Sequence, residues 1–288
     1  MSRIKGMVYS LPTEGRIVIG TATEEFDGKR TPVALNRFVI KTNEIVNGTY
    51  TVHEMHKAVA KATGQDEQKM TFIPIRFIYN DVDVNLRLRY EAYNPLGQLI
   101  CAGDGECAMR QGPEGLNKVG CPGAKNCEFG KQAKCAPRTR MNVKIDIPTP
   151  AGVVNDDYST FSVKSSDWNS AMALSCKLDA ISSELKGNIV GVPMLLTLRE
   201  KSVLTGLQET VYYLDLVLAQ SIEASMKLAK GYADSLASLG INQAGFDAVV
   251  KKGLTNSAFD AASEEDDFME FSEATQTMTS QKKSADYL

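Results

Sequence analysis

Five of the six cysteines in this 288-residue chain lie between residues 101 and 135, and this cluster constrains the fold more than any other feature. Glycines, prolines and charged residues separate the cysteines, so the segment is too polar to hide five free thiols in an apolar core. Thiolates are common ligands of structural zinc, and four of them complete a tetrahedral site. The pattern therefore predicts one zinc ion, with an iron–sulfur cluster as the chemical alternative. The clustered residues are Cys101, Cys107, Cys121, Cys127 and Cys135.

Disulfide bonds are the other common use of clustered cysteines. They are typical of small secreted domains, whereas this chain is long and its first residues, MSRIKGMVYSLPTEGR, lack the apolar stretch of a signal peptide. No apolar run in the sequence is long enough to cross a membrane as a helix. We therefore expect a cytoplasmic protein with reduced cysteines and no membrane partner.

The remaining sequence predicts an α+β fold, with a mainly antiparallel sheet, a few packed helices and an inserted four-cysteine zinc loop at residues 99–140. Strands are expected where apolar and β-branched residues cluster or alternate between turn residues. Helices are expected where apolar residues recur at helical spacing behind a capping residue and ahead of a glycine. The predicted strands are residues 16–19, 33–41, 70–79, 84–93, 141–147, 160–163, 192–199 and 210–218. The predicted helices are residues 52–63, 168–185, 221–239 and 242–253.

Three of these segments carry sharper expectations. Pro74 cannot donate a hydrogen bond to a ladder, so its strand should lie at a sheet edge or break there. In strand 84–93, apolar residues alternate with polar ones that include Arg87 and Arg89. One face of this strand should therefore pack in the core, and the other should be exposed to solvent. Cys176 falls within a predicted amphipathic helix and is expected to be a small core residue.

The composition changes at residue 259. Eight acidic residues and two lysines lie between 259 and 288, with few large apolar residues among them. Such a segment buries too little surface to offset its ordering entropy. We therefore predict a single α+β body at residues 1–258 and a disordered acidic tail at residues 259–288. The body carries a small positive net charge, which is compatible with nucleic-acid binding but does not require it.

The sequence has no G-x-S-x-G elbow, Walker A motif or G-x-G-x-x-G signature. The two histidines, His53 and His56, stand in H-E-x-H and not in the H-E-x-x-H of zinc proteases, and we expect both on the exposed face of a short helix. Asp81 and Asp83 begin a calcium-loop pattern that lacks its glycine and its last glutamate. A zinc ion held by four thiolates has no open position for water. We therefore expect a binding protein and not an enzyme.

Several segments resemble the recombination directionality factor-like family of phages and integrative mobile elements, whose relatives often carry the label "hydrolase or metal-binding protein". The resemblance runs from about residue 5 to residue 255 and leaves the acidic tail outside. The segments that carry it include GRIVIG at 15–20, FIPIRFIYNDVDVNLRLRYEAY at 72–93, LICAGDGE at 99–106, CEFG at 127–130, CAPRTRMNV at 135–143 and VGVPMLLTLREKSV at 190–203.

This resemblance implies that the zinc ligands are Cys101, Cys121, Cys127 and Cys135, with Cys107 as a substitute in the first pair. It also implies a location in a bacterial host cell and a regulatory role, because characterised members bind a serine integrase and change which DNA recombination reaction it performs. Two alternatives stay open: an accessory protein that binds DNA or single strands directly and, third, a metal-dependent hydrolase. The candidate contacts to a protein partner or to nucleic acid are Arg87, Arg89, Arg110, Arg138 and Arg140.

Overall fold

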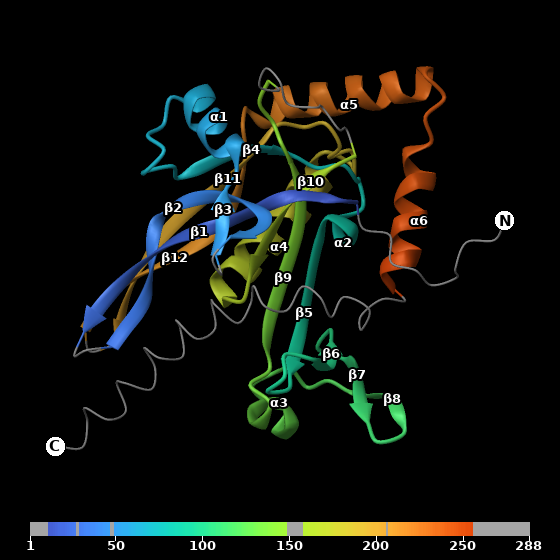
Figure 1. Cartoon of the computed structure of the whole chain (residues 1–288). Coiled ribbons are helices and arrows are strands. Elements are labelled where there is room, and N and C mark those ends of the chain that lie inside the picture. The colour runs from blue at the N-terminus through green and yellow to red at the C-terminus, as the bar shows by residue number, and fades with distance from the viewer. Residues whose placement is uncertain (1–10, 27–28, 47–48, 149–157, 206, 256–288) are drawn as a thin grey trace.

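The fold is α+β and its sheet is mostly antiparallel, which confirms this part of the prediction. The computed structural model describes residues 11–26, 29–46, 49–148, 158–205 and 207–255, and these contain twelve β-strands and six α-helices (Figure 1). The tail predicted at 259–288 lies outside the described residues. Among the described helices, none is both long enough and apolar enough to cross a membrane.

Nine strands form the main path of the sheet, in the order β3-β2-β1-β10-β9-β5-β6-β7-β8. The pair β1–β10 is parallel, and the other neighbours on this path are antiparallel. The bounds are β1 Thr13–Phe26, β2 Lys29–Val46, β3 Thr49–Val52, β5 Leu86–Tyr93, β6 Leu99–Gly103, β7 Cys107–Gly112, β8 Gly115–Gly120, β9 Ala136–Ile145 and β10 Thr160–Ser165.

Three further strands branch from β9: β4 (Phe72–Arg76), β11 (Met194–Thr205) and β12 (Leu207–Leu218). β11 and β12 form a long antiparallel hairpin, and β4 pairs with β11 on one side and with β9 on the other. Pro74 is therefore not on an edge strand, contrary to the expectation. Its carbonyl accepts the N–H of Asp146 at 2.9 Å, so its ring nitrogen faces the end of β9, where one ladder bond is missing, and the pairing with β11 on the other side needs no donor from it.

The core lies on one face of the sheet, against which α4 (Trp168–Glu184) packs. Alternate residues of β1, β2, β9 and β10 point to this face, because successive side chains of a strand point to opposite sides. The hairpin β11–β12 and the strand β4 add further buried residues to the same cluster. Fully or almost fully buried members are Ile17, Phe38, Ile40, Ile73, Ile75, Met141, Val143, Leu174, Leu178, Met194 and Leu216.

The four predicted helices are present with nearly the predicted bounds: α1 Glu54–Thr63, α4 Trp168–Glu184, α5 Ile222–Ser238 and α6 Gln243–Thr255. Gly64 ends α1 with φ +68°, a left-handed conformation that glycine adopts without strain. Asp167 caps α4 by accepting the N–H of Ser170 at 2.7 Å. These signals are local in sequence, which is why the bounds could be predicted.

Side-chain positions on the helices differ from the prediction at three residues. His53 is the N-cap of α1, where its Nδ1 accepts the N–H of Met55, and His56 is buried with a 6% exposed surface. Cys176 is exposed and not a core residue. Helical spacing predicts that a face is buried, but it does not fix which of two neighbouring apolar stripes meets the sheet.

Residues 82–85 form a single-turn helix, α2 (Val82–Asn85), where the sequence predicts the start of a strand. Asp81 caps this turn by accepting the N–H of Val84 at 3.2 Å. Lys251 of α6 binds both Asp81 and Asp83, with nitrogen–oxygen distances of 2.8 and 3.0 Å. The strand β5 consequently begins at Leu86, and α6 is attached beside its start.

Candidate metal centre

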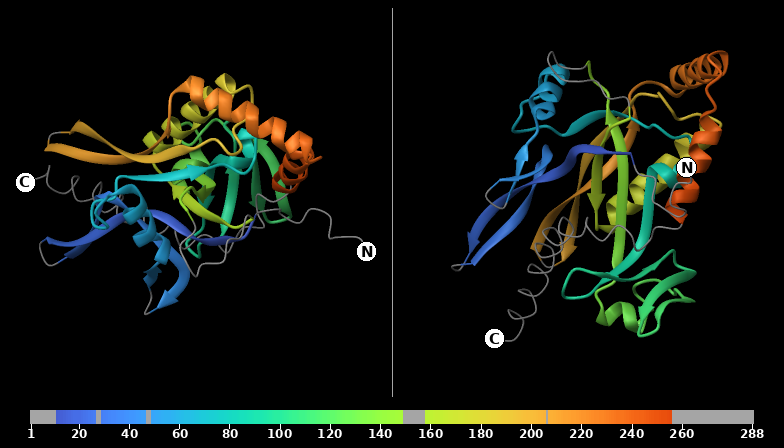
Figure 2. Two further views of the ribbon diagram at one scale, coloured as in Figure 1. Left: turned by 90° about the horizontal axis from the view of Figure 1, so that it is seen from above. Right: turned by 45° about the vertical axis from the view of Figure 1, so that its right-hand side comes forward.

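Strands β5 and β9 run from the core to the clustered cysteines, whose segment, residues 99–135, we call the cysteine tip (Figures 1 and 2). The sequence predicts a loop here, but the segment instead forms the strands β6, β7 and β8 and the short helix α3 (Glu128–Gln132). These strands are short and rich in polar residues, and glycine is disfavoured in strands, so pattern alone does not reveal them. They continue the sheet beyond β5 as its far edge.

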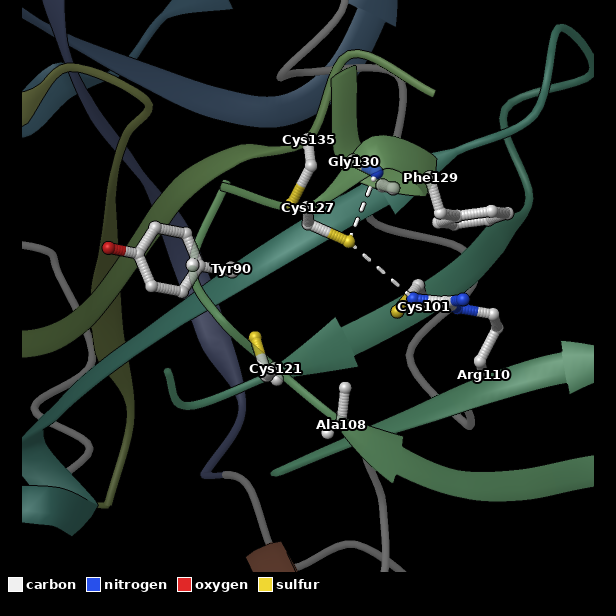
Figure 3. Close-up of a pocket in the computed structure, with 13 residues that line it drawn as sticks. Tyr90, Cys101, Ala108, Arg110, Cys121, Cys127, Phe129, Gly130 and Cys135 are labelled. Carbon is white, nitrogen blue, oxygen red and sulfur yellow. Dashed lines mark hydrogen bonds between the residues drawn. The ribbon is translucent and has the colours of Figure 1, made fainter. Parts of the chain in front are cut away.

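The four cysteines that the resemblance implies line one pocket in this tip (Figure 3). Cys101 comes from β6, Cys121 follows β8, Cys127 is the N-cap of α3 and Cys135 precedes β9. Segments up to 34 residues apart in sequence therefore bring their sulfurs to one place. Tyr90 and Phe129 also line the pocket, and the sequence analysis did not single out either aromatic residue.

Two glycines make room for the sulfurs. A Cβ atom at Gly103 would lie 2.8 Å from the sulfur of Cys121, and one at Gly130 would lie 3.1 Å and 3.2 Å from the Cβ atoms of Cys135 and Cys127. Alanine at Gly103 would therefore displace neighbouring atoms, and alanine at Gly130 would require Cys127 and Cys135 to move by a few tenths of an ångström. The pocket depends on the absence of a side chain at both positions.

Cys127 receives two hydrogen bonds at its sulfur (Figure 3). The N–H of Gly130 donates at 3.3 Å, and the Arg110 guanidinium donates at 3.7 Å while stacking 4.0 Å from the centre of the Phe129 ring. A nearby cation and an N–H aimed at a sulfur both stabilise negative charge on it. Arg110, one of the candidate partner contacts, is thus engaged with the pocket.

The sulfurs are close enough to influence one another. Burial, followed by the negative charges of Cys101, Cys121 and Cys127, raises the pKa of the Cys135 thiol to about 11. Four ionised thiols in one pocket would repel each other, and a bound cation removes that repulsion.

Two cysteines lie outside the pocket. Cys107 is exposed at the start of β7, and the N–H of its backbone donates to the Asp104 carboxylate at 2.8 Å in the turn between β6 and β7. Cys176 is on α4 and is also exposed. Neither is among the residues that line the pocket.

The donor set fits zinc in its chemistry, since four thiols without histidine or carboxylate are a common structural zinc set. In the part of the chain that the structure describes, no group of three or more His, Cys, Asp or Glu side chains forms a ready metal site. The pocket thus gathers the four thiols and provides space between them, but it does not place them at coordination distances.

A buried polar cluster lies where the tip joins the body. Arg140 of β9 forms a 2.7 Å ion pair with Glu91 of β5 and donates to the Tyr93 hydroxyl at 3.0 Å, and Tyr93 donates to Glu91 at 2.6 Å. Glu91 is 3% exposed. Burial and the Glu91 carboxylate raise the pKa of Tyr93, so the phenol stays protonated and can donate.

The arginines proposed as contacts fall into two groups. Arg138 is 7% exposed and lies 5.7 Å from the Tyr93 ring centre, and Arg140 is engaged with Glu91, so both lie inside the molecule. Arg87 and Arg89 are half-buried and stand opposite Arg140 and Arg138 in the β5–β9 ladder. Alternation in strand 84–93 correctly puts Arg87 and Arg89 on one face, but this face was expected to be exposed to solvent, whereas its member Glu91 is 3% exposed and buried beside Arg140.

A family model described as recombination directionality factor-like matches residues 14–219, a range that includes the twelve described strands except for Thr13, and the whole cysteine tip. Neither a curated protein nor a solved structure matches the chain. The match agrees with the resemblance seen in the sequence segments and covers well over half of the chain. On this ground, the protein belongs to the recombination directionality factor-like family.

Proposed function

We propose that this protein is a zinc-binding accessory factor of DNA recombination in a mobile genetic element, which acts by binding a serine integrase or a related recombination enzyme. The observation that carries the zinc part is the convergence of Cys101, Cys121, Cys127 and Cys135 on one pocket. Family membership supports the recombination role. The ion would supply a crosslink between β6, α3 and the start of β9 and would need no catalytic water.

The chemistry of the donor set favours binding over catalysis. Four thiolates complete the coordination sphere of a tetrahedral zinc ion. One thiolate would have to dissociate before this metal could bind and activate water for hydrolysis. The hydrogen bonds from Gly130 and Arg110 to Cys127 hold a ligand in place and leave it less available for such a loss. The tip thereby serves as a rigid surface at the end of two strands.

Metal analysis tests the zinc part. The full chain, purified without chelators, should contain one zinc per molecule, and Cys121→Ser should lower this content, while Cys107→Ser should leave it unchanged. Iron in place of zinc, together with visible absorbance, would mean that the cysteines hold an iron–sulfur cluster. Equal metal content in Cys121→Ser and wild type would mean that the pocket is not the metal-binding site.

An integrase-binding assay tests the partner. Lys118 and Leu116 are exposed on β8 of the tip, so Leu116→Asp with Lys118→Glu should weaken capture of the purified integrase without changing the zinc content. The matched control is Leu239→Asp with Lys227→Glu, two exposed positions of α5 and its end, outside the family match. Equal weakening by both pairs would mean that the tip is not the docking surface.

A further inference from the structure

Two edge strands of the sheet differ in how their outward backbone groups are used. β12 is the outer strand of the hairpin β11–β12, and β8 is the last strand of the cysteine tip (Figure 1). In an antiparallel pair, alternate residues bond to the neighbouring strand, and the residues between them turn their N–H and C=O groups away from it. Outward groups that have no partner can bond to a further extended chain.

Side chains occupy two outward N–H groups of β12. The register with β11 turns Leu214 and Leu216 outward. The N–H of Leu214 donates to the hydroxyl of Ser170 on α4 at 2.8 Å. The N–H of Leu216 donates to the carboxylate of Asp215 at 2.9 Å. A further strand cannot bond to these two groups without displacing the side chains, so this part of the edge is protected.

The outward groups of β8 point to its open side. The N–H of Cys121 donates to the carbonyl of Glu106 at 2.8 Å, and this bond fixes the alternation along β7 and β8. Residues 115, 117 and 119 consequently bond to β7, whereas Leu116, Lys118 and Gly120 turn their N–H and C=O groups outward. In the described part of the chain, no strand pairs with β8 on this outer side.

β8 is both accessible and held in place. Almost all of its residues are exposed, and Leu116 has 48% of its surface exposed. Gly115 and Gly120 at its two ends have no side chains that would obstruct an approaching chain. The bond between Cys121 and Glu106 fastens the end of β8 to the start of β7, so the outward groups stay in one row.

The charge on β8 favours a different protein over a second copy of this chain. Two antiparallel β8 strands that bond through all three outward residues align Leu116 with Gly120, and they place the Lys118 side chains of the two copies opposite each other. Like charges directly opposite destabilise a sheet, whereas opposite charges stabilise it. The complementary strand therefore has an acidic residue opposite Lys118. Residues two positions apart share a face of a strand, so it has an apolar residue two positions away, opposite Leu116.

We propose that the recombination enzyme is bound by strand addition at β8, through an extended segment that has an acidic and an apolar residue two positions apart. This inference rests on the integrase-binding role proposed above and specifies how that partner is held. Main-chain hydrogen bonds at Leu116, Lys118 and Gly120 supply affinity, and the side chains opposite Leu116 and Lys118 supply selectivity. The cysteine tip thus contributes a backbone edge to the interface, and not only side chains.

Two substitutions of Lys118 in the full chain test strand addition. Proline lacks the N–H but is tolerated on an edge strand where that group faces solvent. Threonine removes the same positive charge and keeps the N–H, so the two variants differ in this backbone donor. With the purified serine integrase as the probe, Lys118→Pro should bind at least about tenfold more weakly than Lys118→Thr, because a carbonyl of the added strand loses its donor. Circular dichroism verifies that both variants are folded.

Hydrogen exchange of the wild-type chain gives a second measurement that needs no substitution. Bound integrase should slow exchange at the outward N–H groups of Leu116, Lys118 and Gly120. The N–H groups of Asn117 and Val119 already bond to β7, so their exchange should change less. Mass spectrometry with electron-transfer fragmentation resolves these adjacent residues. Equal slowing at all five positions would contradict strand addition.

The outcomes separate this inference from the proposed function. If wild type binds integrase and the two Lys118 variants bind it equally well, strand addition is overturned while integrase binding stands. If wild type does not bind integrase, the proposed function fails, and this inference fails with it. Sedimentation of the protein alone tests the other occupant. A wild-type dimer that Lys118→Pro dissociates would assign the edge to a second copy and overturn the proposal.

Discussion

The body and the cysteine tip are parts of one sheet, but they are stabilised differently. The body has a continuous cluster of buried residues, in which Phe38, Leu174 and Leu216 are 0% exposed. The tip has a cluster centred on the small residues Ala92, Cys101 and Ala108, with half-buried neighbours. A segment with so little apolar burial needs a crosslink to be stable by itself. The zinc ion proposed above would supply such a crosslink to the tip.

The largest loss of stability is expected from a substitution in the core of the body. Phe38→Ala should lower the free energy of unfolding by about 3–5 kcal/mol, because the change removes buried contacts and leaves a cavity. Urea unfolding followed by circular dichroism measures this loss. The control is Val249→Ala, at a 53% exposed position of α6, where less than about 0.5 kcal/mol is expected. A loss below 1 kcal/mol for Phe38→Ala would mean that the body does not depend on this core.

The next largest loss of stability is expected at the junction between the body and the cysteine tip. Glu91→Gln should lower the free energy of unfolding by about 3 kcal/mol, because it leaves Arg140 buried without its carboxylate. The double variant Glu91→Gln with Arg140→Met should recover part of this loss, since no uncompensated charge remains. Urea unfolding of the three proteins measures both values. If the double variant were no more stable than Glu91→Gln, the ion pair would not explain the loss.

A smaller global effect is expected from the tip. Cys135→Ser should abolish zinc binding and accelerate hydrogen exchange in β6, β7 and α3, while the urea midpoint of the body changes little. Hydrogen exchange followed by mass spectrometry separates the two regions. Cys107→Ser is the matched control, because Cys107 is exposed and outside the pocket, and it should leave exchange in the tip unchanged. Loss of protection in the core as well would mean that the two regions unfold together.

The smallest expected change in stability comes from the protonation of His56 and depends on pH. Burial lowers the pKa of His56 below its usual value of 6.5, although the Glu67 carbonyl opposes this shift. The unfolded chain therefore binds the proton first as the pH falls, so the contribution of His56 to stability is complete above about pH 6.5 and decreases below it. Its Nδ1 accepts the N–H of Ile40, which protonation prevents.

His56→Gln tests this pH dependence. The amide replaces both hydrogen bonds without titrating, so the stability difference between wild type and this variant should change between pH 7.5 and pH 5.5, with wild type losing more. Hydrogen exchange in the tip should be the same in both proteins, because His56 belongs to the body. A stability difference that is constant over this pH range would exclude His56 as the titrating group.

The predictable parts of the molecule are those whose signals are local. Helix α1 ends where Gly64 permits it, and α4 begins where Asp167 caps it, so both bounds follow from a few adjacent residues. The α+β class follows from the mixture of alternating and helical patterns. The four cysteines on the pocket were indicated by resemblance, since their spacing alone admits Cys107 equally well.

The unpredictable parts depend on distant pairing. β7 becomes a strand because β6 offers it an edge, β8 pairs in turn with β7, and neither segment has the apolar alternation that identifies a strand. The burial of Arg140 depends on Glu91, which lies 49 residues earlier. Residues 82–85 alternate like a strand, but the cap at Asp81 makes them a helix. In the first two cases a tertiary contact outweighs the local pattern, and in the third a local cap competes with the alternation.

The parallel pairing of β1 with β10 has a consequence for the order of events during synthesis. The N–H of Thr160 donates to the carbonyl of Pro12, and these residues are 148 apart in sequence. At a translation rate of about 5–20 residues per second, β1 leaves the ribosome roughly 7–30 seconds before its neighbour exists. Its pairing with β2 can form in that interval, but its other edge stays exposed and able to pair with another chain. The nascent protein therefore has a period of vulnerability to aggregation that ends when residues 160–165 emerge and cover this edge.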